Sequence, residues 1–270
     1  MVGADRGLPR RYVVTIASLF ALHPMIVFYG SNGMSEAPFV FFMTWAVRRL
    51  ILWMVDDDVH HLIAAGGVAM GLAYLTRYDA LACIAAAGAV VAVTTYLRAP
   101  GPPRILRALL DLIIISGPGV VAFAGWAIAS WLITGEAFAQ FTSEYGNKAI
   151  LSQSGATGPG FLPGLGFAAT CILLLAPTLI PIGLWAGFIR WRRPRISMLV
   201  PPVVIFSAAL LFQTVTFAAG GTFAFLRFYI IAIPFAATLA LLAVPDGVFV
   251  PAIRPGRHAL PEATVATTRT

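Results

Sequence analysis

The chain has 270 residues, of which 59% are hydrophobic and only 11% are charged, and its formal net charge is +7. A soluble domain of this length needs more polar side chains than this to cover its surface. The basic residues stand in short clusters between long apolar runs, which fits membrane orientation better than a nucleic-acid-binding face. We therefore expect an all-α, polytopic helical membrane protein that binds membrane lipid and no nucleic acid.

Apolar runs of about 20 residues, the length a helix needs to cross the hydrocarbon core, recur along the chain. The first follows Arg6, Arg10 and Arg11 as in a signal peptide, but it continues to Tyr29 without a small-residue cleavage site. We predict about eight transmembrane helices in a single membrane-embedded domain, residues 1–250. The expected spans are 12–30, 37–55, 60–76, 79–97, 108–134, 165–189, 197–219 and 226–245.

The positions of the basic residues predict which loops face the cytoplasm. If the N-terminus is cytoplasmic, 15 of the 18 Lys and Arg residues fall on the cytoplasmic side, and only Arg77, Lys148 and Arg227 are exterior. Because cytoplasmic loops carry the excess of Lys and Arg, we expect both termini to be cytoplasmic and the long loop 135–164 to be exterior. Residues 251–270, rich in Thr, Pro and Arg, should form a disordered cytoplasmic tail.

Several residues within or beside the spans suggest local structure. The acidic run 56–58 precedes His60 and His61, so a metal site is conceivable there, but a solvated cytoplasmic turn is the simpler interpretation. Cys83 and Cys171 lie in apolar runs without metal-binding spacing, and we expect buried free thiols. No protein-bound metal is predicted, and whether a divalent metal is required stays open.

Glycine and proline positions predict how the spans pack and bend. Gly67 and Gly71 form a GxxxG pair, beside Gly66, which is typical of a close contact between two helices. Prolines inside helices remove a backbone hydrogen bond and bend the helix. We expect kinks at Pro118, Pro177 and Pro181.

The expected exterior face collects unusual charges at the ends of spans. Glu36 lies in SNGMSEAP, Arg77 and Asp79 lie in the turn TRYD, and Arg227 lies in GGTFAFLRFY. Each has a structural explanation: Glu36 could stabilise a helix N-terminus beside a capping Ser35, Arg77 could pair with Asp79, and Arg227 could snorkel. The alternative is a site in which arginines bind the phosphate of a lipid and a carboxylate orients or deprotonates an acceptor hydroxyl.

Four segments carry a resemblance to a known family. They occur in this order: HPMIVFYGSNGMSEAPFVFF (23–42), GLAYLTRYDALA (71–82), ITGEAFAQFTSEYGNKA (133–149) and LRFYIIAIP (226–234). Together they resemble the GT-C class of integral-membrane glycosyltransferases, especially its protein-mannosyltransferase-like branch. The resemblance implies transfer of a sugar from a polyprenyl-phosphate donor to an acceptor on the non-cytoplasmic face of the plasma membrane. It implies a catalytic role for Glu36 and substrate-binding roles for Arg77, Asp79, Tyr145 and Arg227.

The chain also departs from this family. Members begin with a span and a large exterior loop that bears the principal catalytic aspartate, whereas this sequence opens with what resembles the family's third span. We therefore expect the C-terminal part of a glycosyltransferase, or a chain whose partner supplies the N-terminal region. The alternative is a non-catalytic membrane protein: a truncated remnant, a scaffold subunit or a transporter.

Overall fold

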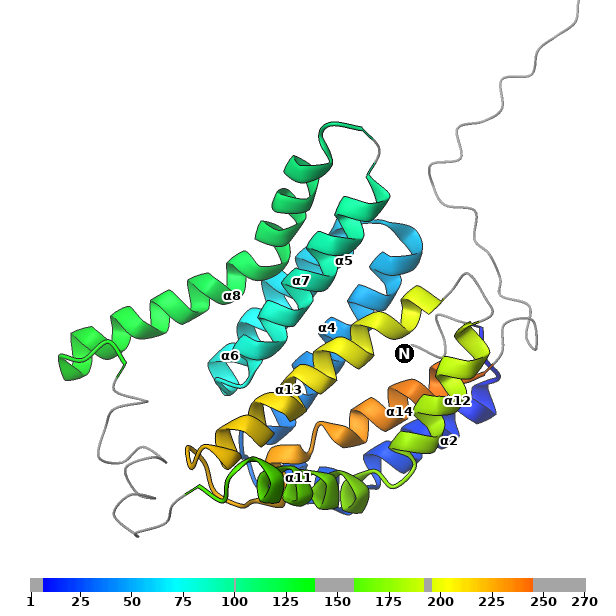
Figure 1. The fold of residues 1–270 in the computed structure, drawn as a ribbon, viewed down its shortest axis with the longest axis vertical. Coiled ribbons are helices and arrows are strands. Elements are labelled where there is room, and N and C mark those ends of the chain that lie inside the picture. Colours follow the sequence, from blue (N-terminus) through cyan, green and yellow to red (C-terminus); the bar gives the residue numbers. More distant parts are fainter. Residues whose placement is uncertain (1–6, 100, 139–157, 192–195, 245–270) are drawn as a thin grey trace, which may run out of the picture.

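The computed structural model describes residues 7–99, 101–138, 158–191 and 196–244 (Figure 1). Every regular element in these ranges is a helix, which confirms the all-α expectation. Five helices are long and apolar enough to cross a membrane, or up to seven if each of two bent pairs counts as one span. These helices indicate an integral membrane protein. The count of eight spans and the cytoplasmic position of both termini stay predictions.

The five long segments are the main helices of the molecule. They are α4 (Glu36–Asp56), the continuous run α5 (Val59–Leu62), η1 (Ile63–Met70) and α6 (Gly71–Thr76), then α7 (Ala80–Arg98), α8 (Arg104–Thr134) and α13 (Val200–Ala218). The large side chains that these helices bury include Met43, Leu50 and Phe206, each fully covered. Many other apolar side chains are exposed, as lipid-facing positions of a membrane protein should be.

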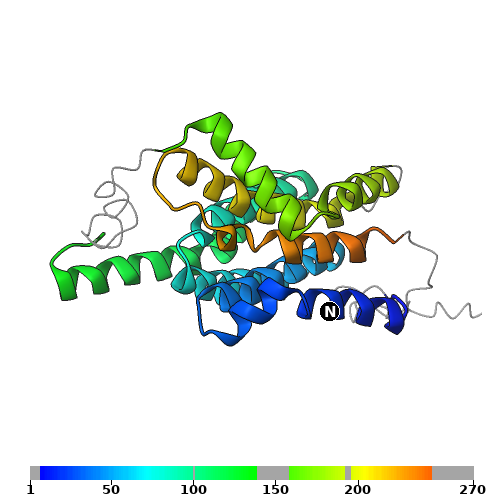
Figure 2. The same ribbon diagram turned by 90° about the horizontal axis from the view of Figure 1, so that it is seen from below.

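The remaining helices are shorter. They are α2 (Arg10–Ala21), α3 (Pro24–Ser31), α11 (Phe161–Leu175), α12 (Leu179–Trp191), η2 (Ile196–Leu199), η3 (Leu226–Tyr229) and α14 (Ala232–Leu242). Helix α14 packs against both α2 and α12. The short helices thus gather on one side of the long ones, whereas α8 extends beyond the other helices on another side (Figures 1 and 2).

Two predicted spans, 12–30 and 165–189, each consist of two helices that meet at a break. Helices α2 and α3 meet at a bend of 62°, and α11 and α12 meet at 83°. At the first break Pro24 starts α3, where its missing N–H needs no partner, and the His23 ring accepts a hydrogen bond from the Met25 N–H at 3.3 Å. At the second, Pro177 does more than kink its span, since it lies between the end of α11 and the start of α12.

The other proline and glycine expectations are met in part. Pro118 lies inside α8, which changes direction midway in Figure 1. Pro181 lies in the first turn of α12, where it leaves no hydrogen bond unmade and breaks nothing. The close helix contact is made by Gly66, where an added Cβ would overlap the backbone of Ile115 on α8. Gly67 and Gly71 have ordinary spacing to Pro118.

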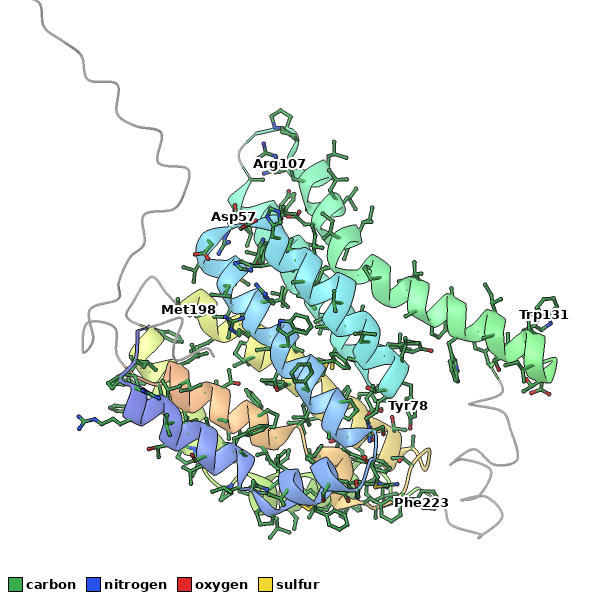
Figure 3. The ribbon with its side chains drawn as sticks, turned by 180° about the vertical axis from the view of Figure 1, so that it is seen from behind. Asp57, Tyr78, Arg107, Trp131, Met198 and Phe223 are labelled. Atoms are coloured by element: carbon green, nitrogen blue, oxygen red, sulfur yellow. The ribbon has the colours of Figure 1, made fainter. Side chains whose placement is uncertain are left out.

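The long helices define two ends of the molecule. Figure 3 shows Asp57 and Arg107 at one end and Tyr78 and Phe223 at the other. We call these the Asp57 end and the Tyr78 end. The distribution of Lys and Arg predicts that the Asp57 end is cytoplasmic and the Tyr78 end exterior.

Candidate functional site

Four charged residues gather at the Tyr78 end, and we call them the charged cluster: Glu36, Arg77, Asp79 and Arg227. Glu36 is the first residue of α4, Arg77 and Asp79 lie in the turn between α6 and α7, and Arg227 lies in η3. Both carboxylates therefore stand at helix N-termini, where the macrodipole favours negative charge. Ser35 occupies the N-cap position of α4, but its side chain makes no capping hydrogen bond.

Arg77 links the two carboxylates of the cluster. Its Nη1 donates to Oε1 of Glu36 at 2.9 Å, and its Nε donates to Oδ2 of Asp79 at 2.9 Å. Its Nη2 lies 2.8 Å from the same Asp79 oxygen. The guanidinium carbon also lies 5.6 Å from the ring centroid of Phe39 and 5.3 Å from that of Phe228. Arg77 thus pairs with Asp79, as the structural explanation held, and with Glu36 as well.

Arg227 is bound less tightly. Its Nε lies 3.7 Å from Oε1 of Glu36, which is an ion pair without a hydrogen bond. Its Nη1 lies 3.9 Å from the sulfur of Met34. The guanidinium carbon lies 4.9 Å from the ring centroid of Phe225 and 5.2 Å from that of Phe228. Aromatic rings therefore orient this guanidinium, and its buried Nε makes no hydrogen bond within the described residues.

Both carboxylates are buried. Glu36 and Asp79 are each 2% exposed. One oxygen of each, Oε2 of Glu36 and Oδ1 of Asp79, is buried and makes no hydrogen bond within the described part of the chain. A buried carboxylate oxygen without a partner is unfavourable by roughly 1–3 kcal/mol, so these oxygens are places where a water or a ligand hydroxyl would bind.

A cavity of about 320 Å³ opens beside the cluster. It is lined by Met34, Ser35, Glu36, Thr76, Arg77, Tyr78, Arg227 and Phe228. Three of the five residues expected in the site, Glu36, Arg77 and Arg227, therefore face one space. Asp79 is not in the lining and contacts the site through Arg77. Tyr145 lies outside the described residues.

Sequence analysis missed the aromatic residues of the site. Phe39, Phe225 and Phe228 surround the two guanidinium groups. For two of them a signal was present, because Phe225 and Phe228 flank Arg227 in the sequence. Phe39 lies one turn after Glu36 on α4, on the same helix face, and helical spacing could have placed it beside the carboxylate.

The structure also bears on metals and thiols. Among the described residues no group of three or more His, Cys, Asp or Glu side chains is arranged to hold a metal ion. Cys83 and Cys171 are both free and buried, as expected. The acidic run at the Asp57 end is solvated, since the Asp57 side chain is 72% exposed.

Comparison of the chain with protein-family models, with curated proteins and with solved structures finds no match. The GT-C resemblance is thus carried by the sequence segments alone, and the geometry of the charged cluster is what bears on function.

Proposed function

We propose that the charged cluster is the site of a glycosyltransferase that takes its sugar from a polyprenyl-phosphate donor and transfers it to an acceptor on the non-cytoplasmic face of the plasma membrane. The observation that carries this proposal is the pairing of Arg227 with Glu36 at one cavity. In the described part of the chain, the Nε of Arg227 and Oε2 of Glu36 both lack a hydrogen-bond partner, and both residues line the same cavity. The cavity lies at the ends of membrane-length helices, where the phosphate of a lipid resides.

The two arginines contribute differently. Arg77 is hydrogen bonded to both carboxylates, so its charge is already balanced and it serves to position Glu36. Arg227 is 27% exposed and has only long contacts, 3.7 Å to Glu36 and 3.9 Å to the Met34 sulfur, which a phosphate can replace. We therefore assign phosphate binding mainly to Arg227.

The chemistry is a displacement at the anomeric carbon of the sugar. The acceptor oxygen forms a bond to that carbon while the bond from the carbon to the lipid-phosphate oxygen breaks, and its electron pair stays with the phosphate. The Arg227 guanidinium stabilises the charge that develops there. Oε2 of Glu36 accepts a hydrogen bond from the acceptor hydroxyl and takes its proton.

The first experiment measures binding of polyprenyl phosphate to the purified protein by native mass spectrometry. Losing a charge-assisted hydrogen bond is unfavourable by about 1.5–3 kcal/mol, so Arg227→Gln should weaken binding by about ten- to a hundredfold. Arg227→Lys should weaken it less, because an ammonium keeps the charge but lacks the fork. The matched control is Arg104→Gln, an exposed arginine that stacks on Tyr96 at the Asp57 end. Unchanged binding by Arg227→Gln would remove the phosphate site.

The second experiment tests Glu36 in the reaction. Glu36→Gln keeps the size of the side chain and its hydrogen bonds but removes the proton acceptor. We expect transfer to be abolished while thermal unfolding in detergent changes little. If the variant transfers sugar at the unmodified rate, the carboxylate only stabilises the start of α4.

One observation favours a second candidate, a transporter. Transporters use helices that break within the membrane, and the bends of 62° at α2–α3 and 83° at α11–α12 match a broken span. Vesicles that carry a labelled polyprenyl-phosphate sugar separate the two functions. Transfer of the label to an acceptor supports the glycosyltransferase, and movement of the label between leaflets without transfer supports the transporter.

A further inference from the structure

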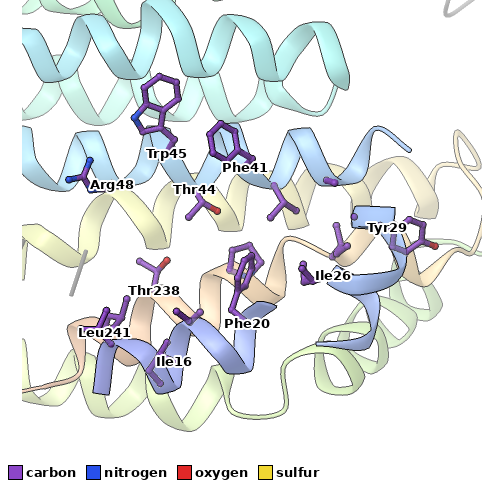
Figure 4. A pocket seen from close by; sticks show the side chains of 18 of the residues that line it. Ile16, Phe20, Ile26, Tyr29, Phe41, Thr44, Trp45, Arg48, Thr238 and Leu241 are labelled. Atoms are coloured by element: carbon purple, nitrogen blue, oxygen red, sulfur yellow. The ribbon is translucent and has the colours of Figure 1, made fainter. Parts of the chain in front are cut away.

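A second and larger cavity lies away from the charged cluster. It is a groove of about 690 Å³ between α2, α3, α4 and α14 (Figure 4). Its walls are almost entirely apolar, with Ile16 and Phe20 from α2, Ile26 from α3 and Leu241 from α14. None of the four charged-cluster residues lines it. We call it the α2–α14 groove.

The groove has the length of one membrane leaflet. Along α4 its lining begins at Ala37, near the Tyr78 end, and continues to Arg48 and Arg49. The step from Ala37 to Arg48 covers about 16 Å of helix at roughly 1.5 Å per residue. This is close to half of the hydrocarbon core, which is about 30 Å thick. A lipid acyl chain from a single leaflet therefore matches the groove.

One end of the groove is positively charged. Arg48 and Arg49 are half-buried in its lining, and the exposed Arg10 and Arg11 begin α2 at the same end. Arg49 has a 3.3 Å contact with Nδ1 of His61, and its Nε is buried without a hydrogen bond in the described part of the chain. This end also coincides with the ends of α2 and α14, which are joined by a 2.9 Å hydrogen bond from the Tyr12 hydroxyl to the Ala240 carbonyl.

We propose that the α2–α14 groove binds an anionic phospholipid of the cytoplasmic leaflet. One acyl chain fills the apolar groove, and the phosphate lies against Arg48 and Arg49. Apolar walls capped by arginines complement this combination of chain and headgroup. The lipid also supplies packing atoms between α4 and the short helices, where an empty apolar cavity would leave the side chains without contacts.

The polyprenyl-phosphate donor is a poorer occupant of this groove. Its phosphate belongs in the charged cluster at the Tyr78 end, whereas the groove has its arginines at the opposite end. The inference is therefore independent of the proposed function. Arg48 lines the groove and Arg227 lines the cavity at the charged cluster, so a substitution at one residue leaves the other site unchanged.

The test measures lipid binding to the purified protein by native mass spectrometry. Phosphatidylglycerol and phosphatidylcholine with the same acyl chains are the two probes. At about 1 kcal/mol for each arginine near the headgroup, the double variant Arg48→Gln, Arg49→Gln should bind phosphatidylglycerol about thirtyfold more weakly. Arg104→Gln is the control, and Arg227→Gln should leave phosphatidylglycerol binding unchanged.

A groove-filling variant tests whether the lipid acyl chain occupies the groove. Ala237→Phe, on the α14 wall, should prevent binding, and Ala17→Phe at the exposed rim on α2 is the milder version if the first fails to fold. Ala124→Phe, on the exposed side of α8, should have no effect. Three results would each overturn the proposal. They are equal binding of the two lipids, unchanged binding by a correctly folded groove-filling variant, and displacement of phosphatidylglycerol by polyprenyl phosphate.

Discussion

The two ends of the molecule carry the same kinds of charged side chain in opposite surroundings. At the Tyr78 end the side chains of Glu36, Asp79 and Arg77 are 2%, 3% and 10% exposed. At the Asp57 end the side chains of Asp57 and His60 are 72% and 82% exposed. Removing a solvated charge changes the stability of the fold little. Removing the partner of a buried charge lowers the stability strongly.

The two ends also differ in how their contacts are distributed along the chain. At the Asp57 end, Asp58 contacts His60 at 2.6 Å within one helical turn, and the longer-range pair of Arg98 with Asp57 is partly solvated. At the Tyr78 end, Glu36 contacts Arg77 and Arg227, from two distant parts of the sequence. Burying charge is unfavourable, and apolar residues of similar volume often stabilise a fold as well or better. A buried cluster assembled from three separate segments is therefore a candidate for function, and an exposed local one is a helix cap.

The largest expected difference between the ends concerns Arg77. Arg77→Gln leaves two buried carboxylates without their main partner, so we expect the free energy of unfolding to fall by about 3–5 kcal/mol. The measurement is chemical or thermal unfolding in detergent. The paired control is Asp57→Asn at the other end, where a change below about 1 kcal/mol is expected. Equal losses at the two ends would break the comparison.

A double variant sharpens the same comparison. Removing Glu36 together with Arg77 eliminates one unpaired charge, so Glu36→Gln should recover part of the stability that Arg77→Gln loses. Contacting residues have interaction energies of about 0.5–3 kcal/mol, and we expect a recovery within this range. Strict additivity in the double-mutant cycle would show that the 2.9 Å contact between the two side chains contributes nothing.

Arg98 provides an intermediate case at the Asp57 end. Its side chain is 35% exposed, lies 3.5 Å from Asp57 and donates to the Met54 carbonyl at 2.8 Å. Partly solvated pairs are worth about 1 kcal/mol or less, so Arg98→Gln should lower the unfolding free energy by no more than about that amount. If Arg98→Gln lowers the unfolding free energy as much as Arg77→Gln does, burial does not explain the difference in stability effects between the two ends.

The smallest effect is expected from Asp58 and depends on pH. Hydrogen bonds from the His60 backbone N–H and then from the His60 ring hold the pKa of the exposed Asp58 below its ordinary value of 3.8. A carboxyl group whose pKa is lower in the folded than in the unfolded protein stabilises the fold when the pH is above the unfolded-state pKa. This stabilisation is lost as the pH falls through the folded-state pKa. Asp58→Asn should therefore unfold at a slightly lower temperature than the unmodified protein at pH 6, with the difference shrinking below about pH 4.

The sequence predicted the long helices and singled out three residues that line one cavity. Apolar length alone placed α4, α7 and α13 within a few residues, because a membrane-spanning helix is set by composition. Exterior arginines at span ends, which oppose the orientation rule, identified Arg77 and Arg227. Glu36 was identified as an acid at the exterior start of a span, and the structure places all three residues along one cavity. Their convergence depends on tertiary packing and was expected from their shared side of the membrane, not from local spacing.

The broken helices could not be predicted in the same way. Residues 12–30 and 165–189 are as apolar as the continuous spans, so hydrophobic composition does not predict where a helix bends. The local signals were His23 and Pro24, a cap followed by a helix-starting proline, and Pro177 with its neighbours. Proline also lies inside α8 without ending it, and the helix bends midway instead (Figure 1). Local sequence alone does not separate the two outcomes.

The lengths of the helices imply that the surrounding bilayer is not uniform. Helix α8 has 31 residues, about 46 Å at roughly 1.5 Å per residue, whereas the apolar helical run Leu226–Leu242, which contains α14, spans about 25 Å. The first is much longer than a hydrocarbon core of about 30 Å and the second is shorter than it. A bilayer meets this mismatch by helix tilt and by thickening on one side and thinning on the other. The thin side is the one where α2 and α14 flank the groove, so lipids with short chains should gather there and longer lipids around α8.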